Sequence, residues 1–177
     1  QRLDEIADSS AHQGVIAYVT PYRYVEVDEL IQRAREKGEA VFLIILDEIT
    51  DPHNLGAIIR TAECCGAHGV IIPKRRSVGL TPAAVKASAG AVEYMPVAKV
   101  TNLARLLDDL KNQGIWIAGA DLAEGARLYT EQDLTGSIAL VIGSEGRGIG
   151  RLVKEKCDFL VGIPLKGRIE SLNASVA

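Results

Sequence analysis

The stretch AVFLIILDEITDPHNLGAIIRTAECCGAHGVIIP, residues 40–73, decides the fold. It opens with an almost unbroken apolar run rich in branched residues, which is typical of a strand buried on both faces. Asp51 and Pro52 then supply an N-cap and a first helical residue, so the sequence predicts a helix that stops at Gly66. A second strand, GVIIP, follows. A strand, a helix and a strand in succession indicate two parallel strands joined by a crossover helix.

The same alternation continues along the rest of the chain. Further helices are predicted over residues 27–38, 81–90, 102–114 and 149–158, and further strands over residues 115–120, 137–143 and 159–164. These elements predict an α/β domain with a mainly parallel sheet and helices on both faces. Ligands of such sheets bind beyond the carboxyl ends of the strands, which selects the loops after Leu46, Ile117, Ile142 and Ile163.

Composition limits the class of protein. With 177 residues, of which 47% are hydrophobic and 24% charged, the chain can bury the core of one globular domain. It has neither an apolar run of about 18 residues nor the pattern of a signal peptide, so we expect a cytoplasmic protein. The net charge of −3 disfavours a protein that coats nucleic acid nonspecifically. Local basic clusters are either solvated surface or phosphate contacts, and the clearest is Lys74, Arg75 and Arg76.

The cysteines and histidines indicate no metal centre. Cys64, Cys65 and Cys157 form no C-x-x-C pair, and the adjacent Cys64 and Cys65 are predicted to be reduced residues that pack in the interior. The three histidines are scattered without the spacing of metal ligands. We therefore predict no metal.

Two segments contain candidates for chemistry. The loop GSEGRGIG, residues 143–150, has four glycines that would let its backbone approach a ligand, but it lacks the Walker ending and the G-x-G-x-x-G spacing. It is either a tight structural turn or a ligand loop in which Glu145 would suit a cation, an amine or a hydroxyl. In the first crossover helix, Arg60 either pairs with Glu63 on the surface or lies buried among apolar neighbours and needs another partner.

Three stretches together resemble a known family. They are NLGAIIR at 54–60, LVIGSEGRG at 140–148 and IPLKGRIESLNASVA at 163–177. In order, spacing and strand context they resemble the three motifs of the SpoU family of RNA ribose methyltransferases, within the SPOUT superfamily. The resemblance implies transfer of a methyl group from S-adenosylmethionine to a ribose 2′-hydroxyl of structured RNA. It also implies a homodimer and a C-terminal trefoil knot, an exception to unthreaded topology.

The resemblance implies roles for particular residues. The catalytic set would be Asn54, Arg60, Glu145, Ser171 and Asn173. The cofactor would lie against Gly119, Gly143, Ile163, Leu165 and Leu172. RNA would contact Lys74, Arg75, Arg76 and Arg147. Because a guanidinium stays protonated in proteins, we expect Arg60 to stabilise the developing alkoxide or hold the adjacent phosphate, and not to act as the base.

The resemblance also implies a domain organisation and a class of substrate. Residues 1–25 resemble the tail of an upstream RNA-binding domain plus a linker, and residues 26–177 the methyltransferase domain without its final helix. The chain is most similar to bacterial enzymes that methylate a guanosine ribose in large-subunit ribosomal RNA, while relatives that act on transfer RNA share the motifs. A noncatalytic RNA-binding dimer stays open. A flavodoxin-like module is disfavoured, because EITDPHNLG after the first strand has one Gly and two acids.

Overall fold

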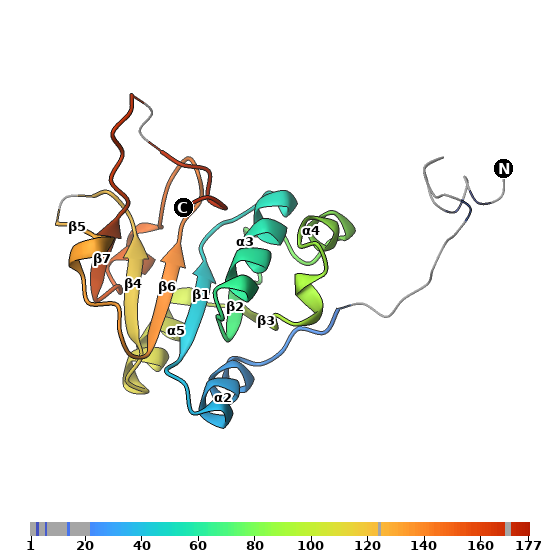
Figure 1. Ribbon diagram of the computed structural model, residues 1–177, viewed down its shortest axis with the longest axis horizontal. Helices are drawn as coiled ribbons and strands as arrows, with labels where there is room; N and C mark the ends of the chain where they lie inside the picture. Colours follow the sequence, from blue (N-terminus) through green and yellow to red (C-terminus); the bar gives the residue numbers. More distant parts are fainter. Residues whose placement is uncertain (1–2, 4–5, 7–13, 15–21, 124, 169–170) are drawn as a thin grey trace.

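The protein is an α/β domain built on one parallel sheet. The computed structural model describes residues 3, 6, 14, 22–123, 125–168 and 171–177. Its strands follow the order β3-β2-β1-β6-β4-β7-β5, and every neighbouring pair is parallel (Figure 1). The strands are β1 Phe42–Leu46, β2 Gly69–Pro73, β3 Val97–Val100, β4 Trp116–Ala120, β5 Arg127–Leu128, β6 Ile138–Ile142 and β7 Phe159–Gly162. The predicted parallel α/β architecture is confirmed.

Helices cover both faces of the sheet. They are α2 Val27–Lys37, α3 Pro52–Cys64, α4 Pro82–Ala87, α5 Leu103–Asn112 and α6 Arg151–Lys154, with 3-10 turns η1 Ala91–Glu93 and η2 Tyr129–Glu131. The pleat of β1 divides the core. Leu43 and Ile45 pack with α2, α5 and α6 on one face, whereas Ile44 and Leu46 pack with α3 and α4 on the other.

Polar side chains cap the amino ends of three helices, and a glycine ends a fourth. The side chain of Asp51 accepts a hydrogen bond from the backbone N–H of His53 at 2.9 Å and so caps α3. Thr81 caps α4 in the same way, and Asn102 caps α5. Helix α2 ends at Gly38, whose φ of 67° lies in the left-handed region that glycine tolerates.

Several boundaries differ from the predictions. β3 and β5 escape the sequence analysis because they have four and two residues and no long apolar run. β4 continues to Ala120, so the loop after it begins three residues beyond Ile117. Helix α6 has four residues in place of the predicted ten, because Lys156 and Cys157 donate to carbonyls three residues back and close the helix in a tight turn.

The predicted packing of Cys64 and Cys65 is wrong. Both thiols are free, but both residues are exposed at the end of α3. The half-buried thiol is Cys157, which donates to the carbonyl oxygen of Val153 at 3.5 Å. Burial raises the pKa of Cys157 to about 11. This thiol therefore stays protonated at neutral pH.

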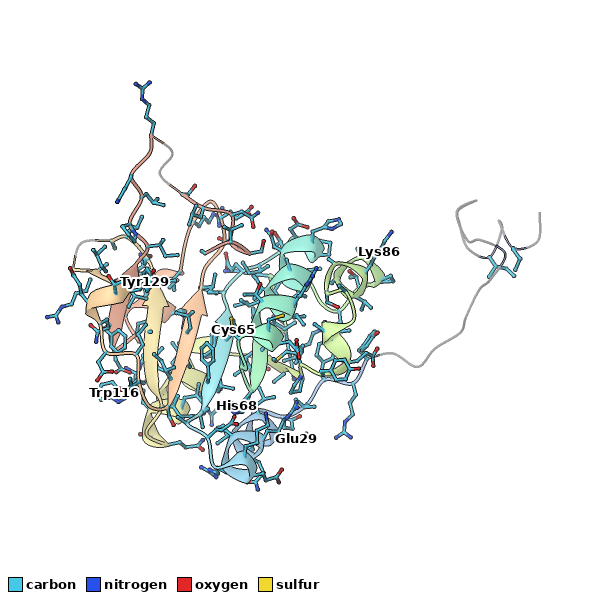
Figure 2. All side chains as sticks on the ribbon, viewed as in Figure 1. Glu29, Cys65, His68, Lys86, Trp116 and Tyr129 are labelled. Atoms are coloured by element: carbon cyan, nitrogen blue, oxygen red, sulfur yellow. The ribbon has the colours of Figure 1, made fainter. Side chains whose placement is uncertain are left out.

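His68 illustrates how a buried polar residue is satisfied within the fold. Its Nδ1 accepts the backbone N–H of Phe42 at 3.0 Å, and its Nε2 lies 3.0 Å from a carboxylate oxygen of Glu39. Figure 2 labels His68 near the amino end of β2 and close to α2. Both ring nitrogens are occupied by structural contacts, so this histidine joins the starts of β1 and β2.

Some expectations concern parts of the chain outside the described residues. Most of the predicted N-terminal tail and linker, residues 1–25, falls there, although Val25 forms a parallel bridge with Ala98. The trefoil knot stays a prediction, because residues 169–170 interrupt the described C-terminal segment. Among the described residues, no helix is long and apolar enough to cross a membrane.

Gly56 determines how closely α3 and α4 approach each other. A Cβ at this position would lie 2.3 Å from the carbonyl oxygen of Ala84 and 2.6 Å from the Cβ of Ala87. The first atom is a backbone carbonyl oxygen and the second is a Cβ fixed to the backbone, so neither can move without a shift of α4. The space beside Gly56 is therefore filled by α4.

We expect Gly56→Ala to lower the free energy of unfolding by about 1–3 kcal/mol, because overpacking outweighs the better helix propensity of alanine. Urea denaturation would measure the change. Glu63→Ala on the exposed side of the same helix is the matched control and should change stability by less than about 0.5 kcal/mol. A Gly56→Ala protein as stable as the wild type would contradict close α3–α4 packing.

Candidate active site

Three segments meet at the carboxyl ends of the strands. They are the turn from β1 into α3, the loop 143–150 after β6, and the C-terminal segment from 171 to 177. Figure 1 shows the C-terminus lying above β6 and beside the start of α3. Trp116, at the amino end of β4, lies at the opposite edge of the sheet (Figure 2). The position agrees with the rule that ligands of parallel sheets bind at the carboxyl edge.

One carboxylate oxygen joins the three segments. Oε1 of Glu145 accepts hydrogen bonds from Nδ2 of Asn54 at 3.0 Å, from Nδ2 of Asn173 at 2.5 Å and from the backbone N–H of Ala174 at 3.3 Å. Asn54 is buried in the first turn of α3. Because the acceptor is charged, these bonds are stronger than bonds between neutral groups. The carboxylate therefore fixes two amide side chains and the C-terminal backbone at once.

The glycines of loop 143–150 permit the turn that presents Glu145. Ser144 and Gly148 exchange two backbone hydrogen bonds, at 3.1 and 2.8 Å, so the loop doubles back on itself. A Cβ on Gly143 would lie 2.1 Å from the carbonyl carbon of Gly148, which only glycine avoids. Gly148 itself has a φ of 65°. The loop is thus a tight structural turn whose tip carries an anionic side chain.

A hollow of about 350 Å³ adjoins this turn. Its walls come from the carboxyl ends of β4 and β7, from the 145–148 turn and from Ile163, Leu165, Ser171 and Leu172. Lys154 and Asp121 form an ion pair of 2.5 Å in one wall. The volume and the combination of apolar walls with a few polar groups are typical of a small-molecule site.

The structure gathers most of the predicted site residues here. Asn54 and Asn173 contact Glu145 directly. Five others line the hollow beside it: Arg147, Ile163, Leu165, Ser171 and Leu172. Gly143 lies beneath the turn and contacts Gly148 instead of the hollow. Asp121 and Lys154 also line the hollow but were not predicted from the sequence. The position of Asp121 directly after a buried strand was a signal for it, whereas no sequence feature indicated Lys154.

Two predicted site residues lie elsewhere. Gly119 sits in the middle of β4, where an added Cβ would lie 2.9 Å from Sγ of Cys157 and 3.1 Å from Ile149, in the core. Arg60 is exposed and lines a separate hollow of about 420 Å³ with Ser88 and Tyr94. Within the described part of the chain its side chain makes no hydrogen bond or ion pair. Both predicted settings of Arg60, an ion pair with Glu63 and a buried position, are therefore wrong.

The predicted RNA contacts lie on the surface. Lys74, Arg75 and Arg76 are exposed in the loop after β2, and Arg76 lies 3.3 Å from the carboxylate of Glu48. Exposed pairs of this kind contribute little to stability, so these cations are available to a ligand. Across the described residues, no group of three or more His, Cys, Asp and Glu side chains could hold a metal ion.

Comparison with known proteins identifies the family. The model of the SpoU rRNA Methylase family matches residues 40–177. The chain belongs to the SpoU rRNA methylase family. It is 55% identical over 177 residues to YacO of Bacillus subtilis strain 168, whose name places it in the TrmH family of tRNA/rRNA methyltransferases; the match covers 100% of this chain and 70% of YacO. A TrmH family relative from Staphylococcus haemolyticus is 51% identical and is covered to the same 70%.

Solved SpoU structures share the fold. AviRb, a SpoU methyltransferase from Streptomyces viridochromogenes, superposes with a TM-score of 0.71 at 30% identity, over 77% of this chain and 55% of that one. AviRb in complex with the cofactor AdoMet gives a TM-score of 0.72 at 30% identity, over 78% of this chain and 54% of that one. An AdoMet-bound rRNA methyltransferase from Sinorhizobium meliloti gives 0.67 at 28% identity, over 77% and 52%. This chain spans about half the length of these structures.

We expect Glu145→Ala to release the C-terminal segment of this SpoU chain. Backbone amides of residues 172–177 should exchange with solvent about tenfold faster or more, because one charge-assisted hydrogen bond contributes roughly 1.5–3 kcal/mol. Hydrogen-exchange mass spectrometry would measure this. Arg147→Ala in the same turn removes a side chain that makes no bond to the segment, so it should leave exchange there unchanged. Equal exchange in wild type and Glu145→Ala would contradict the tether.

Proposed function

We propose that this chain is the catalytic part of an enzyme that transfers a methyl group from S-adenosylmethionine to a ribose 2′-hydroxyl of structured RNA. The observation that carries the proposal is the contact of all three family motifs at one oxygen of Glu145, beside a hollow of about 350 Å³. Membership of the SpoU family and the AdoMet-bound relatives support the cofactor. Names of relatives that include both tRNA and rRNA support an RNA substrate.

The residues around the hollow fit S-adenosylmethionine chemically. Ile163, Leu165 and Leu172 offer apolar surface for an adenine ring, while the carboxylates of Glu145 and Asp121 suit its positively charged groups. When bound, the cofactor supplies an electrophilic methyl group. The hollow lies at the carboxyl ends of β4 and β7, where a bound nucleoside would contact loop backbone.

The chain's own residues would position the acceptor ribose. Methyl transfer needs an in-line approach of the 2′-oxygen and the loss of its proton to a neighbouring group or to the adjacent phosphate, so orientation and charge stabilisation dominate. Glu145 holds the amides of Asn54 and Asn173 in fixed orientations, and Ser171 adds a hydroxyl at the wall of the hollow. The guanidinium of Arg60 would stabilise the developing alkoxide or hold the neighbouring phosphate.

A homodimer would complete this site. Arg60 and Glu145 line different hollows of one chain, and the Arg60 side chain has no partner within the described residues. In a symmetric dimer, Arg60 of one subunit can reach the Glu145 hollow of the other. The finer assignments are also proposals: a guanosine of large-subunit ribosomal RNA as first candidate, transfer RNA as second, and residues 1–25 as the link to an upstream RNA-binding domain.

The decisive test is transfer of a labelled methyl group from S-adenosylmethionine to unmodified ribosomal and transfer RNA transcripts, followed by alkaline hydrolysis. We expect the label in an alkali-resistant dinucleotide, because a 2′-O-methyl group blocks cleavage at that position. A label released as mononucleotide would indicate base methylation and contradict the proposal. Cofactor binding without transfer to either RNA would favour a noncatalytic RNA-binding dimer.

We expect Arg60→Lys and Arg60→Ala to lower kcat about 100-fold or more while the Kd for the cofactor stays within about twofold, because lysine lacks the planar fork. Glu63→Ala, one turn away on the same exposed surface, is the control. A co-purified mixture of Arg60→Ala and Glu145→Ala chains should recover about a quarter of wild-type activity, since half of randomly formed dimers contain one intact site. No recovery would contradict a site shared between subunits.

A further inference from the structure

Asp47 is a buried carboxylate that the proposed mechanism does not use. It follows β1 directly and is only 6% exposed. Within the described residues no cation pairs with it. Burial raises the pKa of this carboxyl, and the charge of Glu48 adds to the increase, while a hydrogen bond from Gly150 opposes it. Burying a carboxylate without a counterion costs free energy. The hydrogen bond from Gly150 is therefore the contact that explains why Asp47 lies here.

The contacts of Asp47 span the base of loop 143–150. Its backbone N–H donates to the carbonyl oxygen of Ile142 at 2.8 Å, which extends the β1–β6 pairing to the residue before the loop. Its Oδ2 accepts the backbone N–H of Gly150 at 2.8 Å, at the last residue of the loop. One residue therefore contacts both ends of the eight-residue turn, in which only Ile149 is buried among apolar side chains.

Gly150 adds an independent observation. Its φ of −58° and ψ of 144° suit any residue, so backbone conformation does not require glycine here. An added Cβ would lie 3.1 Å from Oδ2 of Asp47, closer than ordinary van der Waals contact. A side chain at position 150 would therefore require the carboxylate to shift by a few tenths of an ångström from its place at the N–H.

The hydrogen bond between Asp47 and Gly150 affects two parts of the lining of the hollow, one before Gly150 in the chain and one after it. Before Gly150, the turn carries Glu145, Arg147 and Gly148, which line the hollow. After Gly150, helix α6 begins, and Lys154 donates its backbone N–H to the carbonyl oxygen of Gly150 at 2.9 Å. The same Lys154 forms the ion pair with Asp121, which lies beside Gly148 and also lines the hollow. A shift at Gly150 would displace the turn and this ion pair together.

From this geometry we propose that Asp47 is a positioning residue, whose carboxylate anchors Gly150 and so holds Glu145 and Lys154 in the arrangement that binds the cofactor. Its effect on methyl transfer rests on the proposed function, but its effect on the loop does not. The essential property is a hydrogen-bond acceptor at this position. An asparagine oxygen can accept the same bond, so the negative charge itself is dispensable.

The test combines three variants of the full chain. Asp47→Ala should raise hydrogen exchange of peptides covering residues 143–150 about tenfold or more and weaken binding of S-adenosylmethionine, measured by calorimetry, by a similar factor. Asp47→Asn should stay within about threefold of wild type in both. Gly150→Ala should give an intermediate effect, and adding it to Asp47→Ala should change little, because both act on one contact.

Asp133→Ala is the matched control. Its carboxylate also accepts a backbone N–H, that of Thr135 at 2.9 Å, but in an exposed loop at the amino ends of the strands. It should alter neither exchange in 143–150 nor cofactor binding. The proposal is overturned if Asp47→Ala leaves the loop protected, or if Asp47→Asn is as damaging as Asp47→Ala. Should Asp47→Ala fail to fold, Asp47→Asn and Gly150→Ala still decide the question.

The outcomes separate this proposal from the proposed function. Loop exchange is measured without cofactor or RNA. If the wild-type chain binds S-adenosylmethionine but methylates no RNA, the proposed function fails while the Asp47 anchor is still tested by exchange and binding. If methyl transfer is found but Asp47→Ala affects neither exchange nor binding, only the anchor fails.

Discussion

The site depends on a single oxygen atom of Glu145 that accepts three hydrogen bonds from segments far apart in the sequence. Asn54 is 91 residues before this carboxylate and Asn173 is 28 residues after it. The sheet order makes the meeting possible, because β6 lies between β1 and β4 and brings loop 143–150 beside the turn into α3. Without an anionic acceptor, the buried amide of Asn54 would lack a hydrogen-bond partner, and the exposed amide of Asn173 and the backbone N–H of Ala174 would no longer be held beside it. The carboxylate thus holds the turn into α3, loop 143–150 and the C-terminal segment together at one site.

The parallel sheet was predictable because its strands are buried on both faces and therefore carry long apolar runs such as FLIIL and IALVI. The N-cap Asp51, followed by Pro52, also predicted the start of α3. Strands without that signature were not predictable: β3 contains Lys99, whose ammonium lies over the ring of Tyr24, and β5 has two exposed residues. Their pairing comes from the neighbouring strands and not from their own sequence.

For the site, the motifs indicated the right segments but not the contacts within them. Glu145, Asn54 and Asn173 could be grouped by resemblance, whereas the role of Asp47 depends on a hydrogen bond to a residue 103 positions away. The exposure of Arg60 was also hidden, because apolar neighbours on a helix suggest burial without saying which side faces the core. The orientation of Gly119 was not predictable either: a Cβ at this strand position would face Cys157 in the core, because strand residues alternate between faces.

The contacts around Glu145 also link ligand binding in the hollow to the order of the C-terminal segment. Ser171 and Leu172 line the hollow, and the next residue, Asn173, donates to Glu145. A ligand that contacts Ser171 and Leu172 therefore favours the conformation in which Asn173 is bound, and the Glu145 bond in turn preorganises the wall for the ligand. Linkage requires the two effects to be equal in free energy. Because Ala174 inserts among the residues packed against α3, the same segment connects the hollow to the core. The protein can thus couple a small-molecule site to the packing of the helix that carries Arg60.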